Sequence, residues 1–209
     1  RGHMSTEHSR VMAALAAIPR ARFLPDAVRD RAALDEPLPI GHGATNSQPW
    51  TVQFMLELLR VPEAGRVLDV GSGSGWTTAL LAHLTGPAGT VLGLDVVPEL
   101  VAMGRQNLAG FHLPWARIAD AAPDTPGAPE EAPFDRILVS ADAGRIPDEL
   151  EAQLAVGGRL VLPAAGVMWV VDRDHEGWHR EPVTGYRFAF VPLVQDDRRR
   201  GRNPPPPPS

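Results

Sequence analysis

The sequence predicts an α/β fold built on a mostly parallel sheet. Residues 66–70 read RVLDV, a short apolar run typical of a strand that is buried on both faces. A glycine turn, GSGSG at 71–75, follows directly, and the apolar, alanine-rich stretch 77–84 then favours a helix. Further strand and helix segments alternate downstream, which is the pattern of parallel strands joined by helical crossovers.

The segments after this first unit continue the alternation. Helices are expected at 98–108 and 146–154, and the proline-rich connector 121–133 is expected to be a solvated loop. Two apolar segments, 167–172 and 186–193, are expected to form an antiparallel end of the sheet. The predicted strands between these helices cover residues 90–94, 115–119, 134–140 and 159–163.

The stretch before the core contains two predicted helices and a polar loop. The helices cover residues 6–17 and 49–60, and each places apolar side chains on one face. Residues 35–40 are too rich in proline for a helix, and the loop at 41–49, GHGATNSQP, is polar and rich in glycine. Ser47 is well placed to cap the second helix. A cap alone does not explain why so flexible a loop precedes that helix.

We expect one domain over residues 5–195, made of an N-terminal segment (5–65) and the core (66–195). The last residues, 196–209, read DDRRRGRNPPPPPS. This charged and then polyproline stretch is typical of a disordered or extended tail.

Composition excludes several classes of protein. The chain has 209 residues, a net charge of −5, a pI of about 5.8 and no cysteine. A disulfide framework, a thiolate zinc site and a cysteine nucleophile are therefore excluded, and the acidic balance does not favour binding to nucleic acid. No apolar run approaches the length of a membrane span. We expect a cytoplasmic monomer with no metal, membrane or nucleic-acid partner.

The glycine spacing after the first core strand separates two kinds of nucleotide site. A dinucleotide fingerprint reads G-x-G-x-x-G, whereas this turn reads G-x-G-x-G and has Asp69 two residues ahead of it. A carboxylate at that point would repel a pyrophosphate but suits a cationic ligand. Asp95, at the end of the next predicted strand, can accept hydrogen bonds from ribose hydroxyls. The alternative is a tight strand–helix turn that binds no ligand.

Two of these stretches together resemble a known cofactor site. LDVGSGSG at 68–75, followed by VLGLD at 91–95, resembles the S-adenosylmethionine site of the Rossmann-like methyltransferases. The resemblance implies the class I fold of those enzymes, with a mostly parallel seven-stranded sheet, helices on both faces and an antiparallel C-terminal end. It also implies S-adenosyl-L-methionine as cofactor and S-adenosyl-L-homocysteine as product.

The loop ahead of the core makes the resemblance more specific. LPIGHGATNSQP at 38–49, the glycine turn and APFDRILVSA at 132–141 come in the order seen in protein-L-isoaspartate O-methyltransferases. The resemblance covers about residues 20–193, and it implies that Ser47 is the catalytic residue in a loop that faces cofactor and substrate. The implied cofactor-binding residues are Ala44, Thr45, Asn46, Ser47, Asp69, Gly71, Ser72, Gly73, Asp95, Val96, Asp120 and Ala121.

The resemblance implies methyl transfer to the carboxylate of an isoaspartyl or aspartyl residue in a peptide or protein, as in protein repair. Such a carboxylate has a pKa of about 4 and is ionised at neutral pH, so no strong general base is required. The protein must instead align the oxygen, the methyl carbon and the sulfur, and such positioning can supply roughly 7–11 kcal/mol. The Ser47 hydroxyl can donate a hydrogen bond to one carboxylate oxygen and direct the other at the methyl group.

Several residues depart from the family pattern. Asn46 stands where isoleucine is usual, Ala44 where glutamine is frequent and Ala121 where glycine is usual. Asp142 replaces an apolar residue in a loop close to the substrate, and its charge should weaken binding of a carboxylate unless Arg145 offsets it. The departures leave three alternatives open: a methyltransferase that tailors a ribosomal natural product, a small-molecule O-methyltransferase, and a binding module that has lost catalysis.

Overall fold

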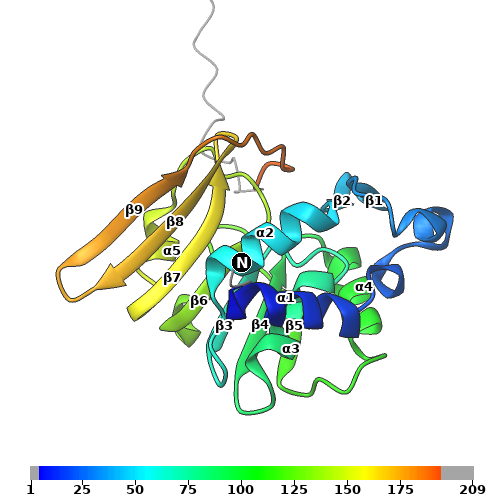
Figure 1. Cartoon of the computed structure of the whole chain (residues 1–209), viewed down its shortest axis with the longest axis horizontal. Coiled ribbons are helices and arrows are strands. Elements are labelled where there is room, and N and C mark those ends of the chain that lie inside the picture. Colours follow the sequence, from blue (N-terminus) through cyan, green and yellow to red (C-terminus); the bar gives the residue numbers. More distant parts are fainter. Residues whose placement is uncertain (1–4, 194–209) are drawn as a thin grey trace, which may run out of the picture.

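The computed structural model describes residues 5–193, and its centre is a seven-stranded sheet (Figure 1). The strands are β3 (Arg66–Val70), β4 (Thr90–Asp95), β5 (Ala116–Asp120), β6 (Phe134–Val139), β7 (Leu154–Ala164), β8 (Val167–Asp174) and β9 (Gly177–Val183). They lie in the order β5-β4-β3-β6-β7-β8-β9. The pairs from β5 to β7 are parallel, whereas β8 and β9 pair antiparallel. The predicted α/β sheet with an antiparallel C-terminal end is therefore confirmed.

The register of the parallel strands brings their carboxyl ends to one edge. Val70, the last residue of β3, pairs with Leu94 of β4 on one side and with Val139 of β6 on the other. Asp95 of β4 pairs in turn with Asp120 of β5. The residues that follow these strands consequently meet at a single edge of the sheet.

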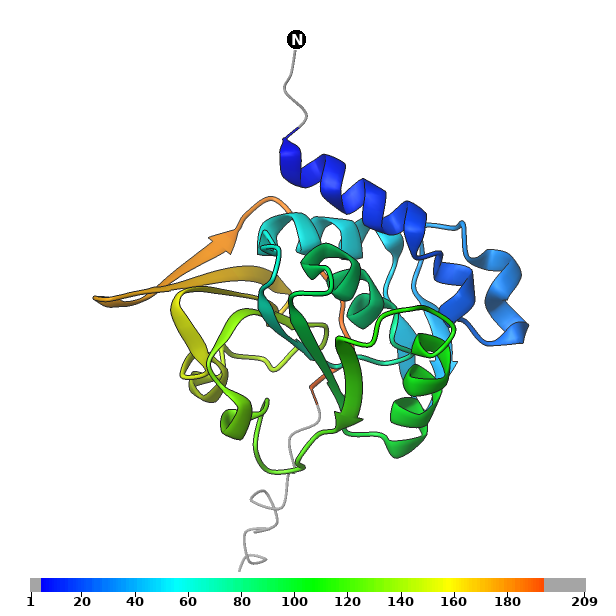
Figure 2. The same ribbon diagram turned by 90° about the horizontal axis from the view of Figure 1, so that it is seen from below.

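Helices cover both faces of the sheet. Val67 and Leu138 pack against the layer of α1, α2 and α3, whereas Leu68 and Ile137 point to the other face, where Leu150 of α5 lies. Figure 2 shows α1, α2 and α3 together on one side, while β8 and β9 extend away as a twisted hairpin. No helix within residues 5–193 combines the length and the apolar character needed to cross a membrane. The helices are α1 (Thr6–Ala17), α2 (Pro49–Leu59), α3 (Trp76–Thr85), α4 (Pro98–Leu108) and α5 (Asp148–Glu151), with 3₁₀ helices η1 (Arg20–Phe23), η2 (Asp26–Arg31) and η3 (Pro129–Glu131).

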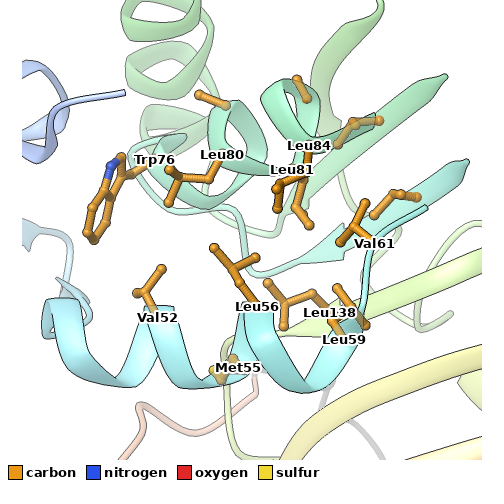
Figure 3. Close-up of a cluster of buried hydrophobic side chains, with 14 of the residues drawn as sticks. Val52, Met55, Leu56, Leu59, Val61, Trp76, Leu80, Leu81, Leu84 and Leu138 are labelled. Atoms are coloured by element: carbon orange, nitrogen blue, oxygen red, sulfur yellow. The ribbon is translucent and has the colours of Figure 1, made fainter. Parts of the chain in front are cut away.

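The core between α2 and α3 is close-packed and apolar. Leu56 and Leu59 of α2 interdigitate with Leu80 and Leu81 of α3 (Figure 3), and all four side chains are fully buried. Trp76 at the start of α3 is also buried, and its indole Nε1–H donates to the carbonyl of residue 18 at 3.0 Å. This packing fixes α2 on the sheet and thereby fixes the loop that precedes it.

The polar loop predicted at 41–49 contains part of a β-hairpin. Strand β1 (Leu38–Gly41) pairs antiparallel with β2 (Ala44–Asn46). Leu38 and Ile40 are buried while the residues between and after them are exposed, so the strand does alternate. Pro39 obscured this alternation of buried and exposed residues in the sequence. Proline is nevertheless tolerated in a strand that has a partner on one side only.

The last strand was predicted in the wrong place. The structure forms β9 from Gly177–Val183, and residues 186–193, which we call the C-terminal strap, form no strand. The strap is apolar because it packs on α2 and on the cleft described below, whereas β9 is an exposed edge strand without apolar alternation. Helix α5 is also shorter than predicted, because β7 already begins at Leu154. The tail predicted at 196–209 lies outside the described residues.

Truncating Leu56 to alanine should lower the free energy of unfolding by about 3 kcal/mol, because it removes a fully buried side chain from the α2–α3 core. Leu34 is 50% exposed, and Leu34→Ala is the matched control, expected to change stability by less than about 0.5 kcal/mol. Urea unfolding followed by circular dichroism measures both. Equal losses in the two variants would contradict the assignment of this core.

Candidate active site

A cleft opens at the carboxyl edge of the sheet, beside the ends of β3, β4 and β6. It encloses about 980 Å³ when its open mouth is included. The chain proceeds from β3 to β4 and β5 on one side and then adds β6 on the other. Parallel sheets bind ligands at such switch points. The walls of the cleft are formed by the β1–β2 hairpin, the glycine turn, the end of β4 and the C-terminal strap.

The glycine turn after β3 brings bare backbone to the cleft. Gly71, Gly73 and Gly75 all have positive φ angles, of 83°, 53° and 96°, which residues with side chains rarely adopt. The N–H groups of Gly71 and Ser72 donate to the carbonyl of Leu94 at 2.8 and 2.9 Å, so the turn remains attached to β4. Gly71 and Gly73 line the cleft.

Asp95 lies beside this turn, at the end of β4. Its carboxylate accepts hydrogen bonds from the backbone N–H of Gly73 at 3.0 Å and of Val97 at 3.1 Å. Each oxygen retains capacity for a further donor, and the side chain is only partly buried. Val96 and Ala121 line the cleft next to it. This end of the cleft thus combines a fixed acceptor with apolar walls.

Asp69 does not reach the cleft. It is fully buried, and one carboxylate oxygen accepts hydrogen bonds from the hydroxyls of Thr77 at 2.7 Å and Thr78 at 2.8 Å. Burial raises the pKa of Asp69 to about 6, although the two threonine hydroxyls act against this rise. The placement argues against the predicted contact with a cationic ligand. Asp69 instead fastens the first turn of α3 to β3.

Three further predicted cofactor residues lie outside the lining. Ser72 is buried, the side chain of Asn46 turns away toward Arg20, and Asp120 is exposed at the end of β5. Their positions along the chain could be predicted from sequence, but the directions of their side chains could not. The predicted residues that do line the cleft are Ala44, Thr45, Ser47, Gly71, Gly73, Asp95, Val96 and Ala121.

One buried arginine holds the end of the hairpin. The Arg20 guanidinium donates from Nε to Oδ1 of Asn46 at 2.6 Å, and from Nη2 to the carbonyls of Asn46 and Ser47 at 3.2 Å each. Nη2 also donates to the carbonyl of Glu36 at 2.7 Å. Asn46, which departs from the family pattern, is therefore an internal partner of Arg20. The role of Arg20 could not be predicted, because nothing in the sequence links this residue to a hairpin that ends 26 residues later.

The hairpin places Ser47 in the lining of the cleft. Helix α2 begins after Gln48, which is its N-cap residue and makes no side-chain capping bond, and Pro49 occupies the first turn. The alternative that Ser47 caps α2 is therefore wrong. Its hydroxyl is not committed to the helix.

Asp142 follows β6 and does not line the cleft. Its carboxylate is hydrogen-bonded to backbone groups of the protein. Its carboxylate accepts backbone hydrogen bonds from Gly144 at 2.7 Å and from Ala165 and Gly166 at 2.8 Å each. Burial alone would raise the pKa of Asp142, but these three donors outweigh it and hold the pKa below its usual value. Arg145 forms an ion pair with Glu149 and not with Asp142. Arg145 therefore does not offset the charge of Asp142, and three backbone N–H groups stabilise the carboxylate instead.

Replacing Asp69 by asparagine should change how stability responds to pH. The folded carboxyl, with a pKa of about 6 against 3.8 normally, keeps its proton in a range where the unfolded one ionises. Folding of the wild type therefore loses up to about 3 kcal/mol as the pH rises from about 4 to about 6. The variant does not titrate, so its stability relative to wild type should rise by that amount across the same window. Urea unfolding at several pH values measures this, and a difference that is independent of pH would contradict it.

Comparison with known proteins agrees with this geometry. The family model described as Protein-L-isoaspartate(D-aspartate) O-methyltransferase (PCMT) matches residues 1–198. A protein-L-isoaspartate O-methyltransferase of Anaeromyxobacter dehalogenans is 47% identical over 92% of this chain and 93% of its own length. One from Methanopyrus kandleri is 39% identical over 90% and 85%.

A solved structure supports the same assignment. A putative protein-L-isoaspartate O-methyltransferase from Plasmodium falciparum, in complex with S-adenosyl-L-homocysteine, superposes with a TM-score of 0.78. It is 25% identical in sequence, over 90% of this chain and 91% of that one. The match over nearly the whole chain, together with the cleft at the switch point, shows that the protein belongs to the protein-L-isoaspartate(D-aspartate) O-methyltransferase family.

Proposed function

We propose that this protein transfers a methyl group from S-adenosylmethionine to the free carboxylate of L-isoaspartyl residues in peptides and proteins. The relatives in Anaeromyxobacter and Methanopyrus are named for that activity. The observation that supports the proposal most directly is the placement of Ser47, which lines the cleft and does not cap α2. A hydroxyl free of the helix can act on a bound substrate.

The glycine turn fits a polar ligand. Three buried polar atoms in this stretch have no hydrogen-bond partner among the described residues: Oδ1 of Asp69 and the hydroxyl oxygens of Ser72 and Ser74. Such orphaned atoms are rare in folded proteins; these three belong to residues outside the lining of the cleft, so ordered water beneath the turn is expected near them. Gly71 and Gly73 also present backbone to the cleft without side chains. Bound S-adenosylmethionine supplies a methyl group made electrophilic by its sulfonium.

The neighbouring residues suit the nucleoside part of that cofactor. In this proposal the Asp95 carboxylate accepts hydrogen bonds from the ribose hydroxyls, since two backbone N–H groups already fix its orientation. Val96 and Ala121 provide apolar contact for the adenine. Asp120 lies outside the lining, but it pairs with Asp95 across the β4–β5 ladder, and we propose it as the acceptor for the exocyclic amine.

The residues around Ser47 provide alignment and not basicity. An isoaspartyl carboxylate is ionised at neutral pH, so no proton has to be removed before attack. Ser47 donates a hydrogen bond to one carboxylate oxygen and leaves the other free to attack. Arg20 holds the carbonyl of Ser47, so the hydroxyl starts from a fixed backbone position.

The methyl ester formed in this way activates the damaged residue for repair. The neighbouring backbone nitrogen displaces methanol from the ester and closes a succinimide. Hydrolysis of that ring then returns part of the chain to normal aspartate.

The partner in this proposal is a peptide or protein that contains isoaspartate, and neither nucleic acid nor a membrane takes part. The net charge of −5 is consistent with this choice, because it disfavours contact with phosphate backbones. We further propose that residues 5–195 act as one catalytic domain and that the protein works as a cytoplasmic monomer.

Incubation with methyl-labelled S-adenosylmethionine and an isoaspartyl peptide should label that peptide. The corresponding aspartyl peptide should remain unlabelled, because its free carboxylate is attached to Cβ and not to Cα. Mass spectrometry detects the gain of one methyl group. Preferential labelling of the aspartyl peptide would favour a peptide-tailoring enzyme, and labelling of neither would contradict the proposal.

Ser47→Ala should lower kcat by about a hundredfold, because one aligned hydrogen bond in a catalytic site contributes about 3 kcal/mol. The dissociation constant for S-adenosylmethionine, measured by calorimetry, should change by less than about twofold. Ser9→Ala, on the exposed side of α1, is the matched control and should leave both values unchanged. An unchanged kcat for Ser47→Ala would remove this hydroxyl from the mechanism.

A further inference from the structure

Asp142 joins two segments that are distant in sequence. The carboxylate accepts from Gly144 in its own loop, and from both Ala165 and Gly166 in the turn between β7 and β8. Three backbone donors thus converge on one side chain, with donor–acceptor distances of 2.7 to 2.8 Å. Hydrogen bonds to an ionised acceptor are roughly twice as strong as neutral ones.

The turn that Asp142 holds is conformationally costly. Ala165 and Gly166 have φ angles of +51° and +77°, and the strand residues on either side of them pair with each other. A two-residue hairpin turn of this kind needs positive φ at both central positions, which glycine or asparagine normally supplies. Ala165 occupies one of them at an energetic disadvantage. The Asp142 carboxylate compensates by binding the N–H groups of both residues.

The C-terminal strap is attached to the same two segments. The N–H of Phe188 donates to the carbonyl of Gly166 at 3.1 Å. Asp142 contributes its own backbone as well, since its N–H donates to the carbonyl of Val191 at 2.9 Å and its carbonyl accepts from Leu193 at 2.8 Å. Every one of these backbone attachments involves Asp142 or the turn that its carboxylate holds.

The strap borders the part of the cleft that the cofactor residues leave free. Gly71 follows β3 and Asp95 ends β4, so both lie on one side of the switch point. Ala141, Phe190 and Val191 line the cleft on the other side, beyond β6. A peptide bound on this second side would contact the strap.

We propose that Asp142 is a positioning residue that fastens the C-terminal strap and thereby sets the affinity for the peptide substrate. This inference rests on the proposed function. Asp142 does not touch the reacting atoms, and it acts by fixing the backbone on which Phe190 and Val191 stand. Its carboxylate is engaged by three N–H groups, so it acts through the backbone and not by contact with the substrate.

Steady-state kinetics with an isoaspartyl peptide should separate this role from catalysis. In Asp142→Ala the KM for the peptide should rise by roughly tenfold or more, the size of effect expected when a charge-assisted hydrogen bond is lost. The kcat at saturating peptide and the dissociation constant for S-adenosylmethionine should stay within about twofold. Asp142→Asn should be intermediate, because its amide oxygen can still accept from Gly144 and Ala165 while its NH₂ group cannot accept from Gly166.

Asp174→Asn provides the matched control. Asp174 also accepts from two backbone N–H groups, of Glu176 at 2.8 Å and Gly177 at 3.1 Å, in the turn between β8 and β9. That hairpin extends away from the helical layers (Figure 1), and Asp174 does not line the cleft. This variant should leave peptide KM, kcat and cofactor binding unchanged.

Hydrogen exchange gives a readout that does not depend on activity. Amides of Phe188 and Leu193 should exchange at least tenfold faster in Asp142→Ala than in wild type, and at an unchanged rate in the Asp174 control. Unchanged exchange would refute the fastening, and faster exchange with an unchanged peptide KM would refute its effect on the substrate. A wild type that methylates no isoaspartyl peptide would refute the proposed function itself. Exchange would in that case still decide whether Asp142 fastens the strap.

Discussion

The cleft depends on the parallel hydrogen-bonded ladders that join β3 to β4 and to β6. These ladders place the ends of three strands side by side, so that residues near positions 71, 95 and 140 converge although they are far apart in the chain. The glycine turn extends the same arrangement, because Gly71 and Ser72 donate to the carbonyl of Leu94 in β4. The β1–β2 hairpin and the C-terminal strap then form the remaining walls of the cleft.

The regular core could be predicted from sequence because its signals are local. A buried parallel strand is a short apolar run and an amphipathic helix repeats every three to four residues, and both patterns identified β3 to β7 and α1 to α4. The C-terminal end was less predictable. The strap is apolar because it covers a cleft, and β9 is polar because it is an exposed edge. Side chains that line a cleft and side chains buried in a sheet are both apolar, so the segment 186–193 was mistaken for a strand, although only Phe188 in it is buried.

The site was predicted at the level of the backbone and less well at the level of side chains. The turn and Asp95 follow from position along strands and loops, whereas Ser47 was implied by the family resemblance, and all of them reach the cleft. Asp69 has the residue type of a ligand contact, but its side chain is buried beneath the turn. One of its carboxylate oxygens accepts hydrogen bonds from two threonine hydroxyls there. For Asp142 the sequence indicated a charge. Only the fold shows that three N–H groups converge on it, and two of them come from a turn more than 20 residues later.

The dependence of the hairpin on Arg20 has a consequence for protein engineering. This guanidinium also donates to the carbonyls of Ala32 and Leu34, so it orders the whole excursion that leads into β1 as well as the end of β2. A chimaera that imports residues 38–47 from a relative would transplant the loop that contains Ser47 without the anchor on which its shape depends. Exchange of substrate preference between members of this family therefore calls for swapping residues 20–47 as one block.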